Sequence, residues 1–371
     1  MISRATDDAT VSGLYIPSTP NNVLWGLLPC GDDPPIARIR SGDIITIDTV
    51  SQEGLMEDQG RDPISWFRSR GMNPSFVLDD AIDIAKNYPL RNLSLAGPHI
   101  VTGPIEVANA MPGDILKVEF LSFLPRVPFG VISSRHGRGA LFDEFPSASQ
   151  IPLGDASIEK PGLISAICTL EERFGMQHLL LAPRGSLPPI ELPFAPFLGL
   201  VGVTPISKTR LNSIPPGEYG GNIDLRDLIA GSVLYLPIQV PGVGFYVGDP
   251  HYAQGHGEVA LTAVEAPLRA TMRLSIIPKK RAKELVGTLT RPFAESSEYW
   301  YCVGLDRDLS EAMKSAVREA LRFLTERFGL QREEAYLYLS AAADFIVTQV
   351  VDNVKGIHCQ IRKKDFRSYL E

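Results

Sequence analysis

A string of eleven residues near the middle of the chain carries two carboxylates, two imidazoles and an amide. It runs from Gly248 to Glu258 and reads GDPHYAQGHGE. Oxygen and nitrogen donors in this mixture suit a divalent ion of the zinc or manganese type, and they equally suit acid–base chemistry without a metal. Alternatively, Asp249 and Glu258 accept backbone N–H bonds in tight turns and the histidines are solvated. No fixed pattern such as HExxH decides between these interpretations.

The segment around this string combines many glycines with negative charge. Nine glycines occur in the 41 residues from 217 to 257, and glycine allows a backbone to approach a ligand closely. Residues 227–268 contain no lysine or arginine but four carboxylates, which are Asp227, Asp249, Glu258 and Glu265. Their counter-charge must come from a distant arginine, from protonation or from a bound metal ion.

Other polar residues are weaker candidates. The string GGNID at 220–224 contains Asn222 and Asp224, and a type I′ hairpin turn explains it as well as a site does. The basic stretch 135–139 could hold an anionic group, although a solvated loop is the simpler interpretation. Four histidines are isolated in the sequence and are expected to be structural: His99, His136, His178 and His358.

The elements that position these residues are predicted to be mostly strands. Three tight Gly-Asp or Gly-Ser turns, at 42–43, 113–114 and 231–232, each precede a run of alternating apolar residues, which predicts a strand with one buried face. The alternation is strict over residues 268–276, where we expect a half-exposed antiparallel strand.

Helical periodicity is confined to the end of the chain. It predicts a helix over 311–328, with Ser310 as N-cap and Gly329 as stop, a second helix over 331–343 and a strand over 345–351. Residues 55–87 are expected to be irregular or partly helical. The sequence therefore predicts a mainly β fold of antiparallel sandwich or barrel type with a C-terminal α+β portion.

Two domains are expected from the length of the chain. The first is a β-rich N-terminal domain at 1–210, and the second is a C-terminal domain at 211–371 that carries most of the site, with an approximate boundary between them. These bounds follow from the late α+β portion and from the position of the glycine-rich segment.

Composition excludes several classes of protein. The 371 residues are 44% apolar and 21% charged, with a formal charge of −7, which argues against disorder and against a dedicated nucleic-acid binder. The most apolar stretch, residues 192–206, is too short and too rich in proline to span a membrane. The chain start lacks a secretory signal, and four widely spaced cysteines suit reduced thiols, so we expect a cytoplasmic protein. No dinucleotide fingerprint or P-loop is present, and we expect no organic cofactor.

Several phrases resemble a known family. In order, they are HIVTGPI at 99–105 with PGD at 112–114, PFLG at 196–199 with VTP at 203–205, IPP at 214–216, GGNID at 220–224, GDPH at 248–251, QG at 254–255 and TQVVD at 348–352. Together they resemble the acetamidase/formamidase family. The resemblance implies a mostly β, cytoplasmic homo-oligomer, a dimer or larger, that hydrolyses the C–N bond of a small carboxamide to a carboxylate and ammonia.

The resemblance also implies that the glycine-rich strings converge on one site. In the leading hypothesis Glu258 is the general base and then the proton donor, and it acts with Asp249 and His251. Asp224, Asp249 and His251 hold a zinc-like divalent ion or orient the water directly. The expected substrate contacts are Asn222, Gln254, His99 and His256, with Glu265 as a further site candidate.

Three positions depart from the family pattern. Leu24 stands where the family has a histidine before Trp-Gly, His256 replaces an aspartate, and Tyr219 replaces a tryptophan or histidine. These changes indicate an altered substrate or a rewired site. Two alternatives therefore stay open: a non-catalytic protein that binds a small molecule or a metal on the same fold, and a hydrolase of another C–N bond, such as that of a carbamate or lactam.

Overall fold

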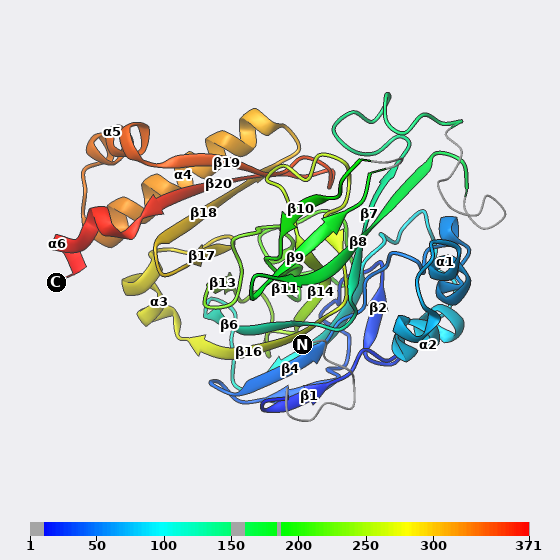
Figure 1. Ribbon diagram of the computed structural model, residues 1–371. Helices are drawn as coiled ribbons and strands as arrows, with labels where there is room; N and C mark the ends of the chain where they lie inside the picture. Colours follow the sequence, from blue (N-terminus) through cyan, green and yellow to red (C-terminus); the bar gives the residue numbers. More distant parts are fainter. Residues whose placement is uncertain (1–10, 150–159, 184–186, 371) are drawn as a thin grey trace.

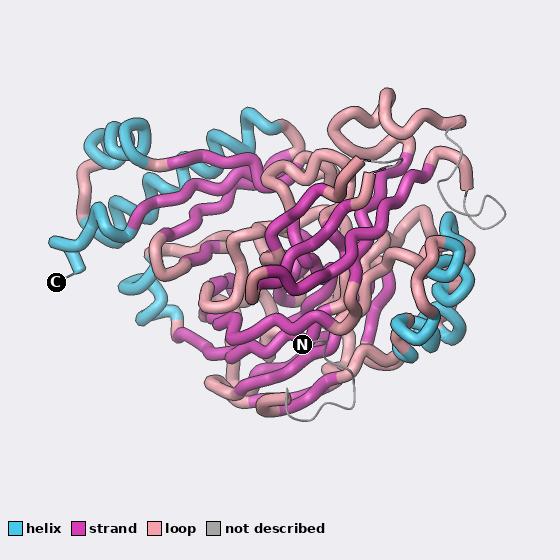
Figure 2. Tube along the Cα trace, in the orientation of Figure 1, coloured by secondary structure: helices cyan, strands magenta, loops and turns pink. Residues whose placement is uncertain are grey.

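Strands dominate the structure, a computed structural model that describes residues 11–149, 160–183 and 187–370. They form two large sheets with mostly antiparallel neighbours (Figures 1 and 2). The predicted mainly β architecture is therefore confirmed. Residues 1–10, from which the absence of a secretory signal was argued, lie outside the described part of the chain.

The first sheet contains nine strands in its described residues. In spatial order they are β1 (Leu14–Ile16), β4 (Ile44–Asp48), β16 (Leu268–Ile277), β6 (Ile115–Pro125), β13 (Val233–Pro237), β17 (Phe293–Glu295), β18 (Tyr299–Asp306), β20 (Lys355–Arg362) and β19 (Asp344–Gln349). Only the β1–β4 pair is parallel among the described pairings of this sheet. Strands β4, β6 and β13 begin directly after the three predicted turns, which confirms the predicted turn-and-strand units.

The second sheet carries the glycine-rich strings. Its main path is β10 (Ile190–Pro193), β9 (Met176–Leu181), β8 (Leu163–Arg173), β7 (Phe129–Arg135), β15 (Val264–Glu265), β14 (Phe245–Ala253), β11 (Phe197–Val203) and β12 (Gly220–Asn222). Strand β5 (Ile100–Val107) pairs with β14 and also with β2 (Val23–Trp25) and β3 (Ala37–Ile39). Every residue of β14 is buried, so this strand lies inside the molecule.

The core lies between the two sheets. One large cluster of buried side chains joins Val118 and Met272 of the first sheet to Val201, Phe245 and Val247 of the second. Apolar faces that pack against each other in this way are typical of a sandwich. Burial of this surface is the main force that holds the strands of the site in place.

The helices lie at two opposite sides of the sheets (Figure 1). They are α1 (Pro63–Ser69), α2 (Asp79–Asn87), α3 (Lys279–Val286), α4 (Leu309–Phe328), α5 (Arg332–Ala342) and α6 (Arg367–Leu370). The C-terminal α+β portion is thus confirmed, and the segment 55–87 is partly helical as expected. None of the described helices combines the length and the apolar character that crossing a membrane requires.

Two predicted elements differ in detail from the structure. The helix predicted over 311–328 begins at Leu309, because the Asp308 side chain, rather than Ser310, caps it by accepting bonds from the Ser310 and Glu311 N–H groups. Gly329 ends it in the left-handed conformation, as predicted. The strand predicted over 345–351 is β19, which ends at Gln349.

Strand β16 is less exposed than its alternation predicts. The alternation places Arg269 and Thr271 on the polar face, which the prediction expects to be exposed, but both residues are buried. The Arg269 guanidinium pairs with the buried Asp48 carboxylate at 2.7 Å and lies under the Tyr15 ring. A paired arginine can occupy a buried position that its charge would otherwise exclude, and periodicity does not reveal such a partner.

The division into two domains near residue 210 stays a prediction. Both sheets contain strands from either side of this position, for example β6 beside β16 and β11 beside β14.

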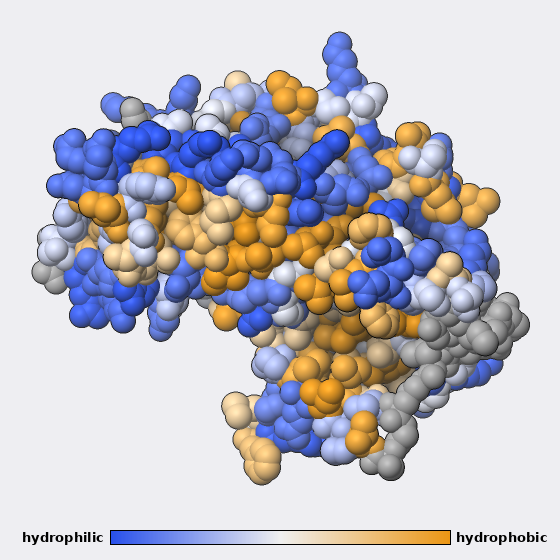
Figure 3. Space-filling view, turned by 90° about the horizontal axis from the view of Figure 1, so that it is seen from above, coloured by the Kyte–Doolittle hydropathy of each residue, from blue (hydrophilic) through white to orange (hydrophobic). Residues whose placement is uncertain are grey.

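Apolar residues gather across the middle of the face seen in Figure 3.

Candidate active site

Strand β14 places the first two site residues. Asp249 and His251 are two positions apart, so both side chains project from the same face of the strand. The next strand, β15, pairs with β14 in a register that sets Glu265 opposite His251. The Glu265 Oε1 atom consequently lies 3.0 Å from His251 Nε2, and Asp249 Oδ2 lies 3.0 Å from the same nitrogen.

Gln254 determines how the His251 ring presents its two nitrogens. Its amide nitrogen donates to the Asp224 backbone carbonyl at 2.9 Å, so its carbonyl oxygen must face His251 Nδ1, which lies 3.1 Å away. An oxygen at this position requires the proton on Nδ1. The His251 Nε2 atom makes no aligned hydrogen bond within the described residues although two carboxylate oxygens lie beside it. Without a metal, a proton on this nitrogen faces the two carboxylates; a metal ion bound there would replace that proton.

Three more carboxylates reach this place from separate loops. Asp224 follows β12, Glu258 lies in the loop after β14, and Asp352 follows β19. One donor atom from each of these three lies within 4.8 Å of the others, and the same holds for Asp224, Asp249 and His251 and for His251, Glu258 and Glu265. All of these side chains are buried.

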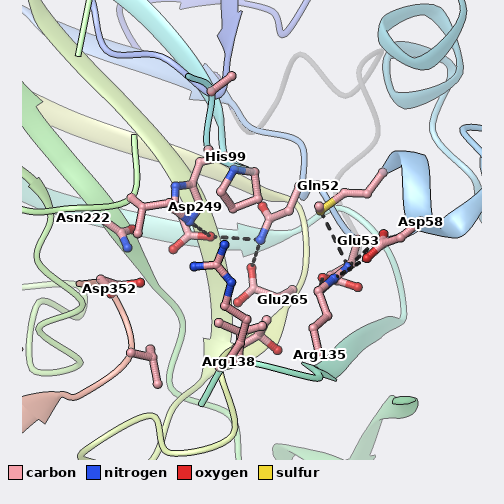
Figure 4. A pocket seen from close by; sticks show the side chains of 18 of the residues that line it. Gln52, Glu53, Asp58, His99, Arg135, Arg138, Asn222, Asp249, Glu265 and Asp352 are labelled. Atoms are coloured by element: carbon pink, nitrogen blue, oxygen red, sulfur yellow. Dashed lines mark hydrogen bonds and ion pairs between the residues drawn. The ribbon is translucent and has the colours of Figure 1, made fainter. Parts of the chain in front are cut away.

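Amide and imidazole groups complete the wall of the site (Figure 4). Gln52 follows β4, and its amide nitrogen bridges Asp249 Oδ1 at 3.3 Å and Glu265 Oε2 at 3.1 Å. His99 precedes β5, and its Nε2 atom lies 3.9 Å from Asp249 Oδ1 while its Nδ1 atom contacts the Ser213 hydroxyl at 3.0 Å. Asn222, at the end of β12, is buried, and its side-chain oxygen has no hydrogen-bond partner among the described groups.

Burial and mutual repulsion set the protonation of the carboxyl groups. Burial, and next the Asp224 charge, raises the pKa of Glu258 well above its usual value. Burial, and next the Asp352 charge, does the same to the pKa of Asp224. Burial and the Asp249 charge raise the pKa of Glu265 to about 8. Asp249 is the exception: burial acts to raise its pKa, but the charges of His251 and His99 and the hydrogen bonds to His251 and Glu265 together lower that pKa.

The imidazoles respond in opposite directions. Burial opposes a charge on His251, but the adjacent Glu265 and Asp249 carboxylates outweigh it and raise the pKa of His251 well above its usual value. Burial dominates at His99 and lowers the pKa of His99, so its ring is neutral near pH 7. The site therefore holds a neutral imidazole, that of His99, and an imidazole that favours the protonated form, that of His251.

Three carboxylate residues of the site have an unusual backbone conformation. Asp224, Asp249 and Glu258 all have positive φ angles, of 47°, 51° and 46°. Non-glycine residues rarely adopt this conformation, which costs about 1–3 kcal/mol each and persists where the surroundings enforce it. Strained carboxylates in a buried cluster are typical of a functional site and argue against a role in ordinary turns.

The cluster opens into a cavity of about 250 Å³. Asn222, Asp249, Glu258, Glu265 and Asp352 line it from inside. A single water molecule needs about 10–15 Å³ of such space, so the cavity accommodates ligands much larger than a three-atom amide.

Basic side chains line the outer part of this cavity. Arg135 is bound by Glu53 at 2.9 Å and by Asp58 at 2.6 Å (Figure 4), so it is not free to hold an anion. Arg138 lines the cavity and is exposed. The basic stretch 135–139 is therefore neither a bare solvated loop nor a ready anion site.

The structure brings most of the predicted site residues together, with one exception. His256 is exposed and lies beside Asp227 and His358, outside the lining of the cavity. The two other departures also lie outside that lining, since Leu24 packs against an apolar cluster and the Tyr219 hydroxyl donates to the Pro215 carbonyl.

Sequence reasoning missed Asp352 and Gln52 as site residues. Asp352 ends the phrase TQVVD, which contributed to the family resemblance, so a signal was present. Gln52 has no comparable signal, because it lies in an ordinary stretch almost 200 residues from its partner Asp249.

Comparison with known proteins now identifies the family. A family model described as the acetamidase/formamidase family matches residues 79–211 and 202–361. The chain belongs to the acetamidase/formamidase family. This family member is similar to the acetamidase of Mycolicibacterium smegmatis, with 27% identity over 313 residues that cover 68% of this chain and 75% of that protein. It is also similar to a putative formamidase of Schizosaccharomyces pombe, with 28% identity and coverage of 68% and 73%.

A solved structure agrees with the fold of this family member. The crystal structure of an acetamidase from Bacillus halodurans superposes with a TM-score of 0.71 at 23% identity and covers 95% of this chain and 99% of that one. At this level of identity the likeness supports the fold alone.

Proposed function

We propose that this chain hydrolyses the C–N bond of a carboxamide to a carboxylate and ammonia. The observation that carries the proposal is the buried group of Glu258, Asp249, His251 and Glu265 at the wall of the cavity. Names of its family relatives, acetamidase and formamidase, point to the same bond. Amide hydrolysis needs a water made nucleophilic and an amine that receives a proton before it leaves.

Glu258 is the proposed acid–base residue. Its carboxyl lines the cavity, and its raised pKa suits a group that accepts a proton from water and then donates it to the leaving nitrogen near neutral pH. Asp249 holds His251 in place, and Gln254 keeps the proton of that ring on Nδ1. Asn222 and His99 line the cavity and are the proposed substrate contacts.

A divalent cation fits the donor set. Both oxygens of Asp224 and one oxygen of Asp352 are buried and have no hydrogen-bond partner within the described chain, and a cation would satisfy them. Asp224, Asp249 and His251 would hold a zinc-like ion. Such an ion would lower the pKa of a water molecule and polarise the amide carbonyl.

Two product assays test the proposal: release of ammonia from a panel of aliphatic, aryl and heterocyclic primary amides and carbamates, and formation of the ring-opened amino acid from lactams. We expect turnover of at least one amide. Glu258→Gln should reduce kcat/KM on that substrate by about 10²–10⁴, because the variant can no longer accept or donate the proton. Glu333→Gln on α5, an exposed glutamate, serves as the matched control and should keep full activity.

Two outcomes would contradict this assignment. A folded Glu258→Gln variant that retains most of its turnover removes Glu258 from the reaction. Bound metal in the wild-type chain, together with no hydrolysis product from any compound of the panel, would favour the non-catalytic binding protein. Turnover of only a carbamate or a lactam would favour the other C–N hydrolase.

The assembly and the location of the protein stay predictions. The family resemblance implies a homo-oligomer in the cytoplasm. The apolar residues across the face in Figure 3 are compatible with a contact between copies.

A further inference from the structure

A second cluster of ligating side chains lies outside the cavity. Asp227 comes from the loop after β12, His256 from the loop after β14, and His358 from β20. We propose that these three residues form a separate site for a divalent metal ion of the zinc class. Two imidazoles and one carboxylate are a common set of protein ligands for such an ion, with the remaining positions filled by water.

The three donor groups are already close to the spacing that a metal imposes. His358 Nε2 lies 3.6 Å from Asp227 Oδ2, and donor atoms of all three residues lie within 4.8 Å of one another. Bond lengths of about 2.0–2.2 Å place tetrahedral ligands roughly 3.3–3.6 Å apart. The His256 ring already lies beside the His358 ring, with ring centroids 5.4 Å apart, and its exposed side chain leaves room for a rotation toward the ion.

His358 is prepared as a ligand in the way that a bound imidazole usually is. Its side chain is fully buried, and its Nε2 atom has no hydrogen-bond partner in the described parts of the chain; the same is true of Asp227 Oδ2. Its other nitrogen, Nδ1, lies 2.8 Å from the Thr348 hydroxyl. A hydrogen bond from Nδ1–H to an oxygen leaves the lone pair on Nε2, which is the tautomer that binds metals.

The site is open to solvent on one side only. His256 is exposed, Asp227 is half-buried and His358 is buried. A metal ion can therefore enter past His256 and reach the interior ligand. None of the three residues lines the cavity, so this site is distinct from the proposed catalytic one.

A metal here would fasten the loop that carries Glu258. That loop already contacts the end of β19. The Gly257 N–H donates to the Thr348 carbonyl at 3.0 Å, and the Val350 N–H donates to the Gly257 carbonyl at 3.1 Å. An ion held by His256 and His358 would add a link from the same loop to the neighbouring strand β20. Its expected role is to hold Glu258 in position.

Arg226 is the nearby opposing charge. It acts electrostatically on both His256 and His358, and it therefore weakens cation binding. Arg226→Gln should tighten the binding of Zn²⁺ by about two- to fivefold, which is the range expected for a partly exposed charge.

Equilibrium dialysis of the chelator-treated full-length chain against Zn²⁺, followed by elemental analysis, tests the proposal. Wild-type chain should bind one more Zn²⁺ per chain than His256→Ala or Asp227→Asn, whatever the catalytic site retains. Zn²⁺ should also raise the midpoint of thermal unfolding more in wild type than in His256→Ala. Thr348→Val should weaken binding by about 10–100-fold, because it removes the partner of Nδ1.

His136→Ala is the matched control, because His136 is also exposed and does not belong to the cluster. It should bind as much Zn²⁺ as wild type. Equal zinc content in wild type, His256→Ala and Asp227→Asn would overturn the proposal, whether that content is zero, one or two ions per chain.

Discussion

Negative charge is the dominant feature at the scale of single residues. Asp224, Asp249, Glu258, Glu265 and Asp352 are all buried near one another, and the imidazoles of His99 and His251 lie among them. Burial without compensation is unfavourable by several kcal/mol for an ionised group. The chain tolerates this arrangement because its sheets fix the side chains from five separate segments.

Replacing Asp352 tests whether this charge is retained for function at the expense of stability. Burial, and next the Glu258 charge, raises the pKa of Asp352 well above its usual value. In the presence of a chelator and at a pH where Asp352 is ionised, Asp352→Asn should therefore raise the free energy of unfolding by about 1–4 kcal/mol, since it removes a buried charge from a repulsive group. The same variant should lose activity by about 10²-fold or more if a cation or a proton is shared there. Thermal unfolding and ammonia release measure the two effects.

Asp344→Asn provides the matched control, because Asp344 is exposed on β19. It should leave both stability and activity near the wild-type values. If Asp352→Asn lowered stability and activity together, Asp352 would be a structural residue and the charge argument would fail.

Local sequence was sufficient to find some of these residues and not others. Asp249, His251 and Glu258 lie within ten positions, in a stretch rich in glycine, so their types and spacing carry a signal. Gln52 reaches Asp249 only because β4 and β14 belong to sheets that pack together. A contact of that kind depends on tertiary packing and leaves no mark on neighbouring residues.

At the scale of elements, β11 makes room for the site. Gly199 lies on this strand, beside β14. If residue 199 carried a Cβ atom, the three atoms nearest to it would all belong to the site. A Cβ atom there would lie 2.4 Å from Asp224 Oδ1, 2.6 Å from Asp249 Oδ2 and 2.7 Å from His251 Cε1. The site geometry therefore requires a residue without a side chain at position 199 of β11.

Gly199→Ala should displace these groups and reduce kcat/KM by about 10²-fold or more, since shifts of about 1 Å have effects of that size. Gly255→Ala is the control, because a Cβ atom at Gly255 meets nothing within 4 Å. Steady-state kinetics of both variants measure the change in kcat/KM, and circular dichroism checks that both are folded. Full activity in Gly199→Ala would show that the site can shift without loss and would contradict the proposed positions.

Elements with local signals were predicted well. The turns at Gly42, Gly113 and Gly231 and the helix that ends at Gly329 depend on neighbouring residues, and each was predicted close to its observed position. The burial of both faces of β16 was not predicted, because Arg269 is buried through its ion pair with Asp48 on another strand. Strand order was likewise beyond sequence reasoning, since it is determined by long-range pairing.

At the scale of the whole molecule, each sheet contains strands from both halves of the chain. Strand β6 pairs with β16 over ten residue pairs, and β5 and β11 both flank β14. Each half alone would therefore lose many backbone hydrogen bonds and expose long strand edges, which promote aggregation. The site itself draws Gln52 and His99 from one half and the remaining groups from the other.

Expression of 1–210 and 211–371 as separate chains tests the predicted domain boundary. Because each fragment lacks the partners of its longest strands, we expect neither to unfold cooperatively or to release ammonia, whereas co-expression of both should restore a folded complex. Circular dichroism during heating and size-exclusion chromatography provide the measurements. Cooperative unfolding of either fragment by itself would establish an independent domain, and the pairing between β6 and β16 would then be an interface between domains rather than part of one folding unit.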